Sequence, residues 1–572
     1  MPTDKYVIGI DFGTESGRVV VVRVRDGEEM AAAVVPYPDG VLDEKLPGGG
    51  QLEPDSALQN PRDYFLVLEK GVPKALKEAG VKANDVVAVG TDFTSCTVFS
   101  TTQDGTPLCL LPKYRRAPLA WAILWKHHAA QPEADRINEI GRERDEEFIR
   151  MYGGKYSSEW FFAKVLQISE WFFAKVLQIL NDSPEVYEAA DRLIEGTDWI
   201  VWQLTGQEKR NNSTAGYKAM WVKGVGFPSH DFFRAVHPRL ENVIEEKVGT
   251  EFYSLGARAG GLTARWARAM GLREGTPVSM GVADGHASIP ATTVTKPGSL
   301  SMVMGTSFVQ MLMGRERRIV EGICGVVEDG IVPGYWGYEA GQYAGGDMFA
   351  WFFDHAVPAY AKSQAKKLKL PFTAWLEKQA AAYQPGESGL VALDWWNGNR
   401  CVLVDADLTG LLLGATLATP PEAIFRALME SAAFGTRQII EAFDAEGLHT
   451  SEVVACGGLP AKNKLLMQIY ADVLGREIKV AKHPQTCSAL GAAIHAAAAA
   501  GRRAGGYDSI PEAATHMAHL QSETYRPRPA SQKIYNRLFQ EFRTLHDYFG
   551  RGANDVMKRL KALRREIVAS AG

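Results

Sequence analysis

The residues best suited to chemistry lie in three glycine-containing turns, each of which follows an apolar run. The turns are DFGTESG at 11–17, GTS at 305–307 and GG at 457–458. Glycine accepts positive φ and lets backbone N–H groups come close to phosphate oxygens. A single turn of this kind is common in ordinary hairpins. Two strand-Gly-Thr-strand hairpins in distant parts of one chain instead predict two similar α/β domains that face each other across a phosphate.

The other common phosphate-binding signatures are missing from the sequence. There is no G-x-x-x-x-G-K-[ST] loop and no G-x-G-x-x-G opening a helix, so neither the P-loop nor the Rossmann type of nucleotide site is supported. The hairpins themselves supply hydroxyl and N–H donors for β- and γ-phosphates. These candidate ATP-binding residues are Gly13, Thr14, Ser16, Gly305, Thr306 and Ser307.

Charged residues beside the first turn could complete the phosphate site. Asp11 ends an apolar run, where Mg²⁺ is a natural partner for a carboxylate, although the side chain could instead cap the turn. Arg18 could add positive charge near the phosphates or form a salt bridge at the strand edge. At the third turn, Gly457 and Gly458 leave room for a flat base, and Asn463 could reach adenine or ribose; a tight turn without a ligand would need the same glycines.

Asp284 is a candidate catalytic acid or base, because the sequence VADGH places it between a strand and a helix. A role as helix N-cap fits that position equally well. Three histidines, His127, His128 and His286, show no i,i+4 metal-binding spacing among themselves. We therefore expect surface or capping roles for them.

Strands and helices alternate in an order that predicts a mixed sheet in each half of the chain. We expect a polar, helical C-terminal segment at 531–569 to present a solvated face. The expected strands are 5–13, 18–25, 28–37, 85–90, 277–283, 299–314 as a hairpin, and 453–456; the expected helices are 61–79, 420–443, 462–474 and 489–500, with further helical segments around 130–206.

Length and composition are typical of a large enzyme with small-molecule substrates. The chain has 572 residues, more than one core usually supports, and a formal net charge of -4, which predicts no nucleic-acid partner. Its six cysteines lack metal-binding spacing, so buried free thiols in a reducing compartment are expected. Without a signal core or a membrane-length apolar run, we expect a cytoplasmic protein that does not bind membranes.

Several strings resemble the FGGY carbohydrate kinases of the actin-like ATPase superfamily, namely DFGTESGR, MGTS, CGGLPAKN and the final YRP followed by a helix. Longer strings resemble the ribulokinase branch of that family: GTDFTSCT, LWKHHAAQPEADRINE, GGKYSSEW, GVADGHAS, GYEAGQYAGGDMFAWF, ALDWWNGNR and DLTGLLLGATLAT. The resemblance runs from about Tyr6 to Phe549. It therefore covers nearly the whole chain.

The resemblance implies two actin-like (ribonuclease H-like) domains, at 1–290 and 291–572, with an ATP and sugar cleft between them. It implies ATP- and Mg²⁺-dependent phosphorylation of L-ribulose to the 5-phosphate, with Asp284 as general base. One alternative is a sibling kinase of the same family that acts on xylulose, ribitol or glycerol. An alternative of another class is a non-catalytic, nucleotide-gated binding module. The oligomeric state is left open, and a homodimer is one alternative. The sugar-lining positions that it implies are Ser95, Cys96, Trp125, Lys218, Asp284 and Glu339.

One segment departs from the family pattern. The string SEWFFAKVLQI occurs at 158–168 and again at 169–179, whereas the family carries this element once. Eleven residues turn a helix through about 1100°, only about 20° past three full turns, so a second copy can extend a helix by about 16.5 Å with its apolar stripe in register. We expect this extended helix; the alternative is that one copy bulges into solvent.

Overall fold

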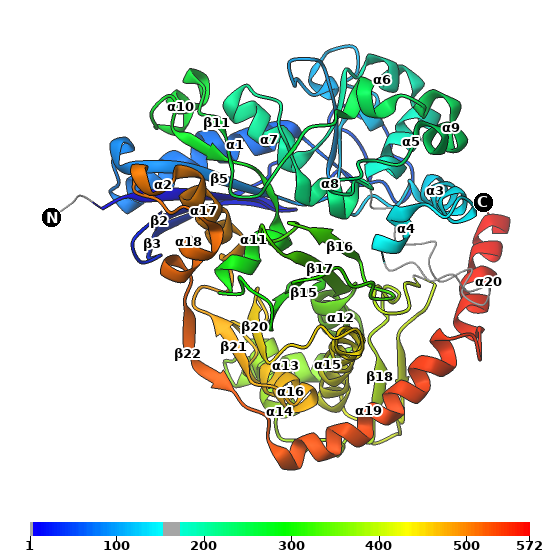
Figure 1. The fold of residues 1–572 in the computed structure, drawn as a ribbon. Helices are drawn as coiled ribbons and strands as arrows, with labels where there is room; N and C mark the ends of the chain where they lie inside the picture. Colours follow the sequence, from blue (N-terminus) through cyan, green and yellow to red (C-terminus); the bar gives the residue numbers. More distant parts are fainter. Residues whose placement is uncertain (1–3, 153–171, 406, 572) are drawn as a thin grey trace.

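The computed structural model of the protein describes residues 4–152, 172–405 and 407–571. Two large mixed sheets, one from each half of the sequence, lie one above the other in Figure 1 with helices around them. The predicted boundary between residues 290 and 291 lies at the end of α11 (Asp284–Ala291). As a boundary between independent domains it stays a prediction.

The first sheet is built around an antiparallel meander and parallel strands, in the order β11-β12-β5-β1-β2-β3 with β13 beside β5. The central strands read VIGIDF and VVVV and are almost wholly buried, which is the pattern of a sheet covered on both faces. The bounds are β1 (Tyr6–Phe12), β2 (Ser16–Arg23), β3 (Glu29–Pro36), β5 (Val86–Phe93), β11 (Arg258–Gly261), β12 (Pro277–Ser279) and β13 (Val282–Ala283).

The second sheet repeats this plan, in the order β16-β17-β15-β14-β20-β21-β22. β14, β15 and β17 form the antiparallel meander, and β20 and β21 continue in parallel from β14. Both predicted Gly-Thr hairpins are therefore confirmed. The bounds are β14 (Ser299–Met304), β15 (Phe308–Gly314), β16 (Gly325–Glu328), β17 (Trp336–Gln342), β20 (Glu452–Cys456), β21 (Ile478–Ala481) and β22 (Leu520–Tyr525).

Helix α17 (Cys487–Ala500) connects the two halves, because this element of the C-terminal half packs on β1 and β5 of the first sheet and on α11. Its alanine-rich sequence allows a close approach to the sheet. A Cβ at Gly9 on β1 would collide with the backbone carbonyl of Ala489. Only glycine fits at this crossing of strand and helix.

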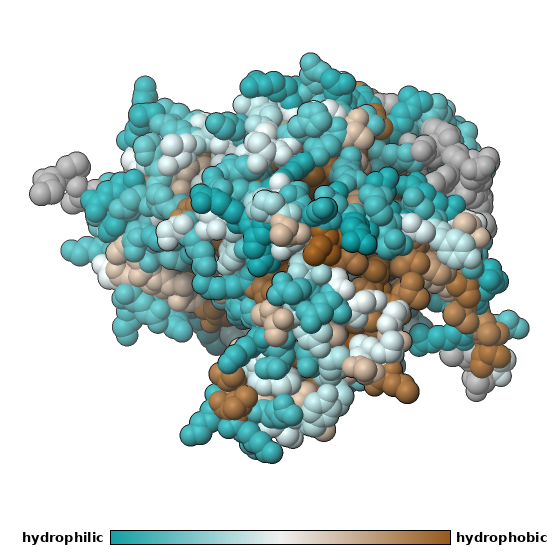
Figure 2. All heavy atoms as spheres, turned by 90° about the horizontal axis from the view of Figure 1, so that it is seen from below, coloured by the Kyte–Doolittle hydropathy of each residue, from teal (hydrophilic) through white to brown (hydrophobic). Residues whose placement is uncertain are grey.

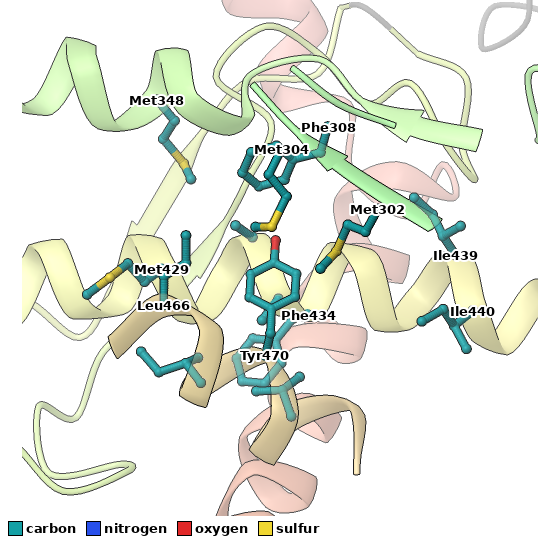
Figure 3. Packing of buried hydrophobic residues seen from close by; sticks show 14 of the residues in the cluster. Met302, Met304, Phe308, Met348, Met429, Phe434, Ile439, Ile440, Leu466 and Tyr470 are labelled. Carbon is teal, nitrogen blue, oxygen red and sulfur yellow. The ribbon is translucent and has the colours of Figure 1, made fainter. Parts of the chain in front are cut away.

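The Gly305–Ser307 turn is anchored in the core of the C-terminal half on both of its sides. Met304 and Phe308 flank the turn, and Figure 3 shows them facing Tyr470 of α16 (Lys464–Leu474), above α15 (Pro421–Ala445). The rings of Phe308 and Tyr470 lie 6.4 Å apart, edge to face. Because both neighbours of the turn are buried, its backbone is held by packing rather than by local hydrogen bonds alone.

Further elements complete the N-terminal half. The predicted helix at 61–79 is present as α1 (Pro61–Leu66), a π-helical turn (Val67–Gly71) and α2 (Val72–Ala79). The N-terminal half also contains a smaller, four-stranded sheet with the order β4-β7-β6-β8. Its strands and neighbouring helices are β4 (Leu58–Gln59), β6 (Val98–Thr101), β7 (Ala122–Ile123), β8 (Arg192–Glu195), α3 (Gln131–Glu143), α4 (Glu147–Met151), α5 (Phe172–Asp182), α7 (Gly196–Thr205), α8 (Asn212–Lys218) and α9 (His230–Val236).

Helix α5 contains the second copy of the repeated string. Its residues from Phe172 to Leu180 are all buried, including Lys175 and Gln178. Residues 158–168 of the first copy, and 169–171 of the second, lie outside the described residues. The predicted extended helix therefore stays a prediction, while the second copy from Phe172 onward is a helix of the core.

The C-terminal segment forms α19 (Pro529–Gly550) and α20 (Val556–Ala571), and α19 is not simply solvated: Tyr535, Phe539 and Phe542 are buried against Phe434 of α15. An apolar residue every three or four positions within a polar sequence gives one helix face to the core. All six cysteines are buried and free, as predicted.

The histidine prediction is wrong at two of three positions. His127 is 1% exposed, with Nδ1 accepting from the Ala57 N–H at 3.0 Å and Nε2 2.9 Å from Gln178 Oε1. His286 is 3% exposed, whereas His128 is exposed as expected. Apolar neighbours and polar partners far along the chain enclose both buried rings, and sequence spacing does not show them.

The surface seen from below is mostly hydrophilic, with apolar residues gathered on one side of the view (Figure 2). Large exposed apolar residues of the C-terminal half include Leu413, Leu417, Leu560, Leu563 and Ile567. Within the part of the chain that the structure describes, no helix has the length and apolar character needed to cross a membrane.

Candidate active site

Three carboxylates converge where parallel strands of the first sheet end. Asp11 on β1 is in register with Asp92 on β5, and β13 pairs with the same end of β5, so that Asp284 at the start of α11 follows directly. The carboxyl ends of parallel strands meet at one edge of a sheet and are the usual place for ligands in such folds. The sequence analysis singled out Asp11 and Asp284 but missed Asp92.

Burial and the negative charge of Asp11 raise the proton affinity of both Asp284 and Asp92. Burial, together with the charge of Asp11, raises the pKa of Asp284 to about 7. Asp92 has no exposed surface, and neither of its carboxyl oxygens has a hydrogen-bond partner; burial and the charges of Asp11 and Asp284 raise its pKa well above the usual range. Such a cluster binds protons or a cation more readily than it holds three negative charges.

The first glycine turn is tied to its surroundings from several sides. The Gly13 N–H donates to the Ser16 carbonyl at 3.2 Å, which closes the hairpin. Gln59 Nε2 donates to the Thr14 carbonyl at 2.5 Å, and Trp125 Nε1 donates to the Thr14 hydroxyl at 3.1 Å. Arg18 forms an ion pair with Asp11, with Nη1 3.0 Å from Oδ2. The salt-bridge alternative for Arg18 is thus the one that this structure contains.

The second and third turns lie side by side, because β14 and β20 are parallel neighbours with Val303 opposite Cys456. Gly457 has a φ of 104°, and its N–H donates to the Pro484 carbonyl at 2.7 Å. A side chain at Gly457 would strike the backbone of Met304 as well as require that strained φ. Asn463 caps α16, accepting from the Leu466 N–H at 2.8 Å.

Asp347 is bonded to the second turn through its backbone. The Asp347 N–H donates to the Thr306 carbonyl at 3.1 Å. Burial raises the pKa of the Asp347 carboxyl, and the positive charge of Lys126, from the N-terminal half, opposes this rise. Lys126 follows Trp125, which binds Thr14. The charge of Lys126 thus acts on a residue bonded to the second turn, while its neighbour Trp125 is bonded to the first; the approach of the two turns across a phosphate stays a prediction.

Glu339 and Lys218, two of the predicted sugar-lining residues, form a buried ion pair between the halves. Lys218 Nζ lies 3.1 Å from both Glu339 oxygens. Arg400 Nη2 donates to Oε1 at 2.8 Å, and His286 Nε2 lies 3.4 Å from Oε2. Burial alone would raise the pKa of Glu339, but Lys218 and Arg400 outweigh it and lower that pKa to about 2. Burial lowers the pKa of His286 to about 4, so its ring is neutral.

The remaining predicted sugar residues, Ser95 and Cys96, form the turn between β5 and β6. Cys96 has a φ of 59° and is buried, while Ser95 is partly exposed. The ammonium of Lys175 on α5 donates to the Cys96 carbonyl and, at 2.9 Å, to that of Leu124. The repeated string therefore supplies a buried ammonium that contacts both this turn and Leu124, the residue before Trp125.

The contacts link the predicted residues into two groups. At the first turn Trp125 is bonded to Thr14 and Arg18 is paired with Asp11, whereas Lys218 and His286 both contact Glu339. Besides burial, the charges of Asp11 and Glu339 raise the pKa of Asp284. Sequence reasoning missed Asp92, Arg400 and His286. The strings GTDFTSCT and ALDWWNGNR contain Asp92 and Arg400 but assigned no role to either residue; the register of Asp92 beside Asp11 and the contact of Arg400 with Glu339 appear only in the fold.

Another missed residue is Glu195, which ends β8 and is 4% exposed. Burial raises the pKa of its carboxyl to about 8, although Lys175 and Lys218 oppose this. At neutral pH it is therefore largely protonated. A neutral carboxyl between two buried lysines adds a hydrogen-bond donor to the same region of the protein.

Comparisons with known proteins agree with this geometry. The model described as the N-terminal domain of the FGGY family of carbohydrate kinases matches residues 6–289, and that of its C-terminal domain matches 300–500. A protein named Ribulokinase from Geobacillus thermodenitrificans is 56% identical over 558 residues, covering 97% of each chain. A Ribulokinase from Halalkalibacterium halodurans is 54% identical over 98% of each chain.

Solved structures show the same fold at lower identity. The xylulose kinase from Rhodospirillum rubrum aligns with a TM-score of 0.74 at 24% identity, over 95% of this chain and 98% of that one. The gluconate kinase from Lactobacillus acidophilus gives 0.77 at 16%, over 96% and 99%. The expected actin-like (ribonuclease H-like) α/β fold is thereby confirmed, and the chain belongs to the FGGY family of carbohydrate kinases.

Proposed function

We propose that this protein transfers the γ-phosphoryl group of ATP to the terminal hydroxyl of L-ribulose, giving L-ribulose 5-phosphate and ADP. The observation that carries the proposal is the near full-length identity to proteins named Ribulokinase, 56% in the first case. The site is consistent with it, because the first sheet ends in buried carboxylates beside one glycine turn, and a buried ion pair between Lys218 and Glu339 joins the two halves.

Asp284 is proposed as the general base. Phosphoryl transfer needs positioning, charge neutralisation and an acceptor for the proton of the attacking hydroxyl. With a pKa of about 7, the carboxylate of Asp284 is a much stronger base than an ordinary aspartate and is still substantially ionised at neutral pH. No catalytic group with these properties is needed by a protein that only binds nucleotide.

The N–H and hydroxyl groups of the two Gly-Thr hairpins are proposed to bind the β- and γ-phosphates. Gly305 and Thr306 are exposed, and Thr14, Ser16 and Ser307 are partly exposed, so their donors are accessible. Arg18 would neutralise phosphate charge once the Asp11 carboxylate binds a metal cation instead of the Arg18 guanidinium. Gly457, Gly458 and Asn463 are proposed for the nucleoside end of ATP.

The carboxylate cluster fits Mg²⁺. Asp11 would hold the ion, and the unpaired, buried oxygens of Asp92 lie beside it. Among the described residues no group of three or more histidine, cysteine, aspartate or glutamate side chains could hold a metal ion by itself. Mg²⁺ takes one or two carboxylates, and phosphate oxygens and water complete its shell. When bound, it supplies neutralisation of the phosphate charge.

Ser95, Cys96, Trp125, Lys218 and Glu339 are proposed to line the sugar. Lys218 and Glu339 present a donor and an acceptor side by side, which suits neighbouring hydroxyls, and Trp125 supplies an aromatic wall. Closure of the halves over the substrates would exclude water and limit ATP hydrolysis.

A sugar panel tests the proposal. The purified protein, ATP and Mg²⁺ are combined with L-ribulose, D-xylulose, ribitol or glycerol, and ADP release is followed. We expect the highest kcat/KM with L-ribulose. A clear preference for another polyol would make the protein a sibling kinase, and no sugar-dependent ADP release with any of them would favour the non-catalytic module.

A further inference from the structure

Glu339 is held by a second cation besides its predicted sugar-site neighbour Lys218. Arg400 Nη2 donates to Glu339 Oε1 at 2.8 Å, and its side chain is only 13% exposed. Lys218 belongs to α8 in the N-terminal half, whereas Glu339 and Arg400 both belong to the C-terminal half. The carboxylate thus has one partner across the cleft and one on its own side.

The segment that carries Arg400 is fastened to the strand of Glu339. Cys401 Sγ accepts from the Gly341 N–H of β17 at 3.3 Å. Asn399 and Asp405 exchange backbone hydrogen bonds of 2.7 and 2.8 Å, which close the loop around Arg400. The guanidinium lies 5.9 Å from the ring centroid of Tyr343. Arg400 and Glu339 therefore move as one body, and their contact does not depend on the position of the N-terminal half.

The charges explain why two cations are needed. If Lys218 turns toward a sugar hydroxyl, or if the halves separate, Glu339 loses its cross-cleft partner while it remains buried. A buried carboxylate without a partner is costly and takes up a proton. An arginine stays charged in every protein environment and presents a fixed planar fork of donors. It therefore preserves both the charge and the orientation of the carboxylate.

We propose that Arg400 is a positioning residue for the sugar: it fixes the Glu339 carboxylate so that Glu339 and Lys218 can accept from and donate to L-ribulose hydroxyls. His286 supports the same carboxylate from α11, as a neutral ring 3.4 Å from Oε2. The inference rests on the proposed function of this site. It predicts an effect on sugar binding that is separate from ATP binding.

The test compares Arg400→Ala and Arg400→Lys with the unchanged protein. Because hydrogen bonds to charged groups contribute about 1.5–3 kcal/mol, Arg400→Ala is expected to raise KM for L-ribulose about tenfold or more. KM for ATP should change less than about twofold, because a variant that weakens only sugar binding raises KM for the sugar and not for ATP. Arg400→Lys should lie between the two, and methylguanidinium at non-denaturing concentration should restore sugar affinity to Arg400→Ala.

Arg437→Ala is the matched control. Arg437 lies in the same half, pairs with Glu441 at 3.0 Å and is 20% exposed, but it contacts none of the site residues. This variant should keep KM for L-ribulose. Direct titration of L-ribulose without ATP should show the same order of affinities as KM.

Three results would overturn the inference: an unchanged KM for L-ribulose in folded Arg400→Ala, an equal rise in KM for both substrates, or no effect of methylguanidinium. If Arg400→Ala fails to fold, Arg400→Lys decides by the same comparison of KM values. Absence of L-ribulose turnover in the unchanged protein would instead refute the proposed function, so the two failures are distinguishable.

Discussion

Trp125 Nε1 donates a 3.1 Å hydrogen bond to the Thr14 hydroxyl, and this bond joins the predicted wall of the sugar site to the predicted phosphate turn. The two residues lie in different elements, Thr14 between β1 and β2 and Trp125 just after β7. The indole thus orients the hydroxyl that is proposed to bind phosphate. The bond connects the proposed sugar site with the proposed phosphate site.

Replacing Trp125 by phenylalanine should keep the aromatic wall but release Thr14. A neutral hydrogen bond contributes about 0.5–1.5 kcal/mol, so we expect kcat/KM for ATP to fall roughly two- to tenfold, with a smaller change in KM for L-ribulose. Trp121→Phe is the matched control. Its indole also loses one hydrogen bond, of 3.1 Å to the Arg115 carbonyl, but that bond does not reach the turn. Equal effects of both variants would contradict the coupling.

Replacing Asp284 by asparagine keeps size and polarity but removes the proton acceptor. We expect kcat to fall by roughly two to four orders of magnitude. ATP binding, measured by titration in the absence of sugar, should be retained, because the phosphate turns are unchanged. Turnover near that of the unchanged protein at saturating L-ribulose would show that Asp284 is not the general base.

The pH profile should report the same residue. The pKa of Asp284 is raised to about 7 by burial and by Asp11, and a general base acts only when deprotonated. Activity should therefore rise with pH through about 7 and fall below it. In Asp11→Asn one negative neighbour is gone, so the pKa of Asp284 should be lower and the acidic limb should shift to lower pH. An acidic limb that does not move in Asp11→Asn would contradict this assignment of the profile.

The sequence predicted the parts of this fold that depend on local pattern. Buried β-branched runs located the central strands, and the Gly-Thr pairs located both hairpins, since their glycines close turns that few other residues allow. Asp11 and Asp284 were found because each ends a strand. Asp92 also ends a strand, but the expected strand 85–90 stops two residues before it, and no role was assigned to it. Only its register beside Asp11 reveals the carboxylate cluster.

Residues that act through distant partners were beyond local patterns. Arg400 lies in a loop, 61 positions from Glu339, and only the tertiary fold brings the two together. His127 and His286 were expected to have surface or capping roles because they lack metal-binding spacing, yet buried partners enclose both. The C-terminal segment was expected to be solvated, but the spacing of Tyr535, Phe539 and Phe542 already contained the apolar face of α19.

The repeated string offers a comparison of two identical segments in one protein. Lys175, in the second copy, has no exposed surface, and its ammonium donates to the carbonyls of Cys96 and Leu124. In Lys175→Met both carbonyls lose this donor, and an unsatisfied buried polar group costs about 1–3 kcal/mol. We expect a lower Tm and a higher KM for L-ribulose, because the Cys96 turn loses its support.

The same substitution in the first copy, Lys164→Met, is the matched control, since its neighbours in sequence are identical over the whole string. It should leave Tm and KM unchanged, because the second copy already fills the core position. If the two copies exchanged in that position, Lys175→Met would be mild and only the double variant would be unstable. Deleting 158–168 or 169–179 gives one and the same chain. That chain should retain the buried contacts of α5 and its activity, because a single copy satisfies them.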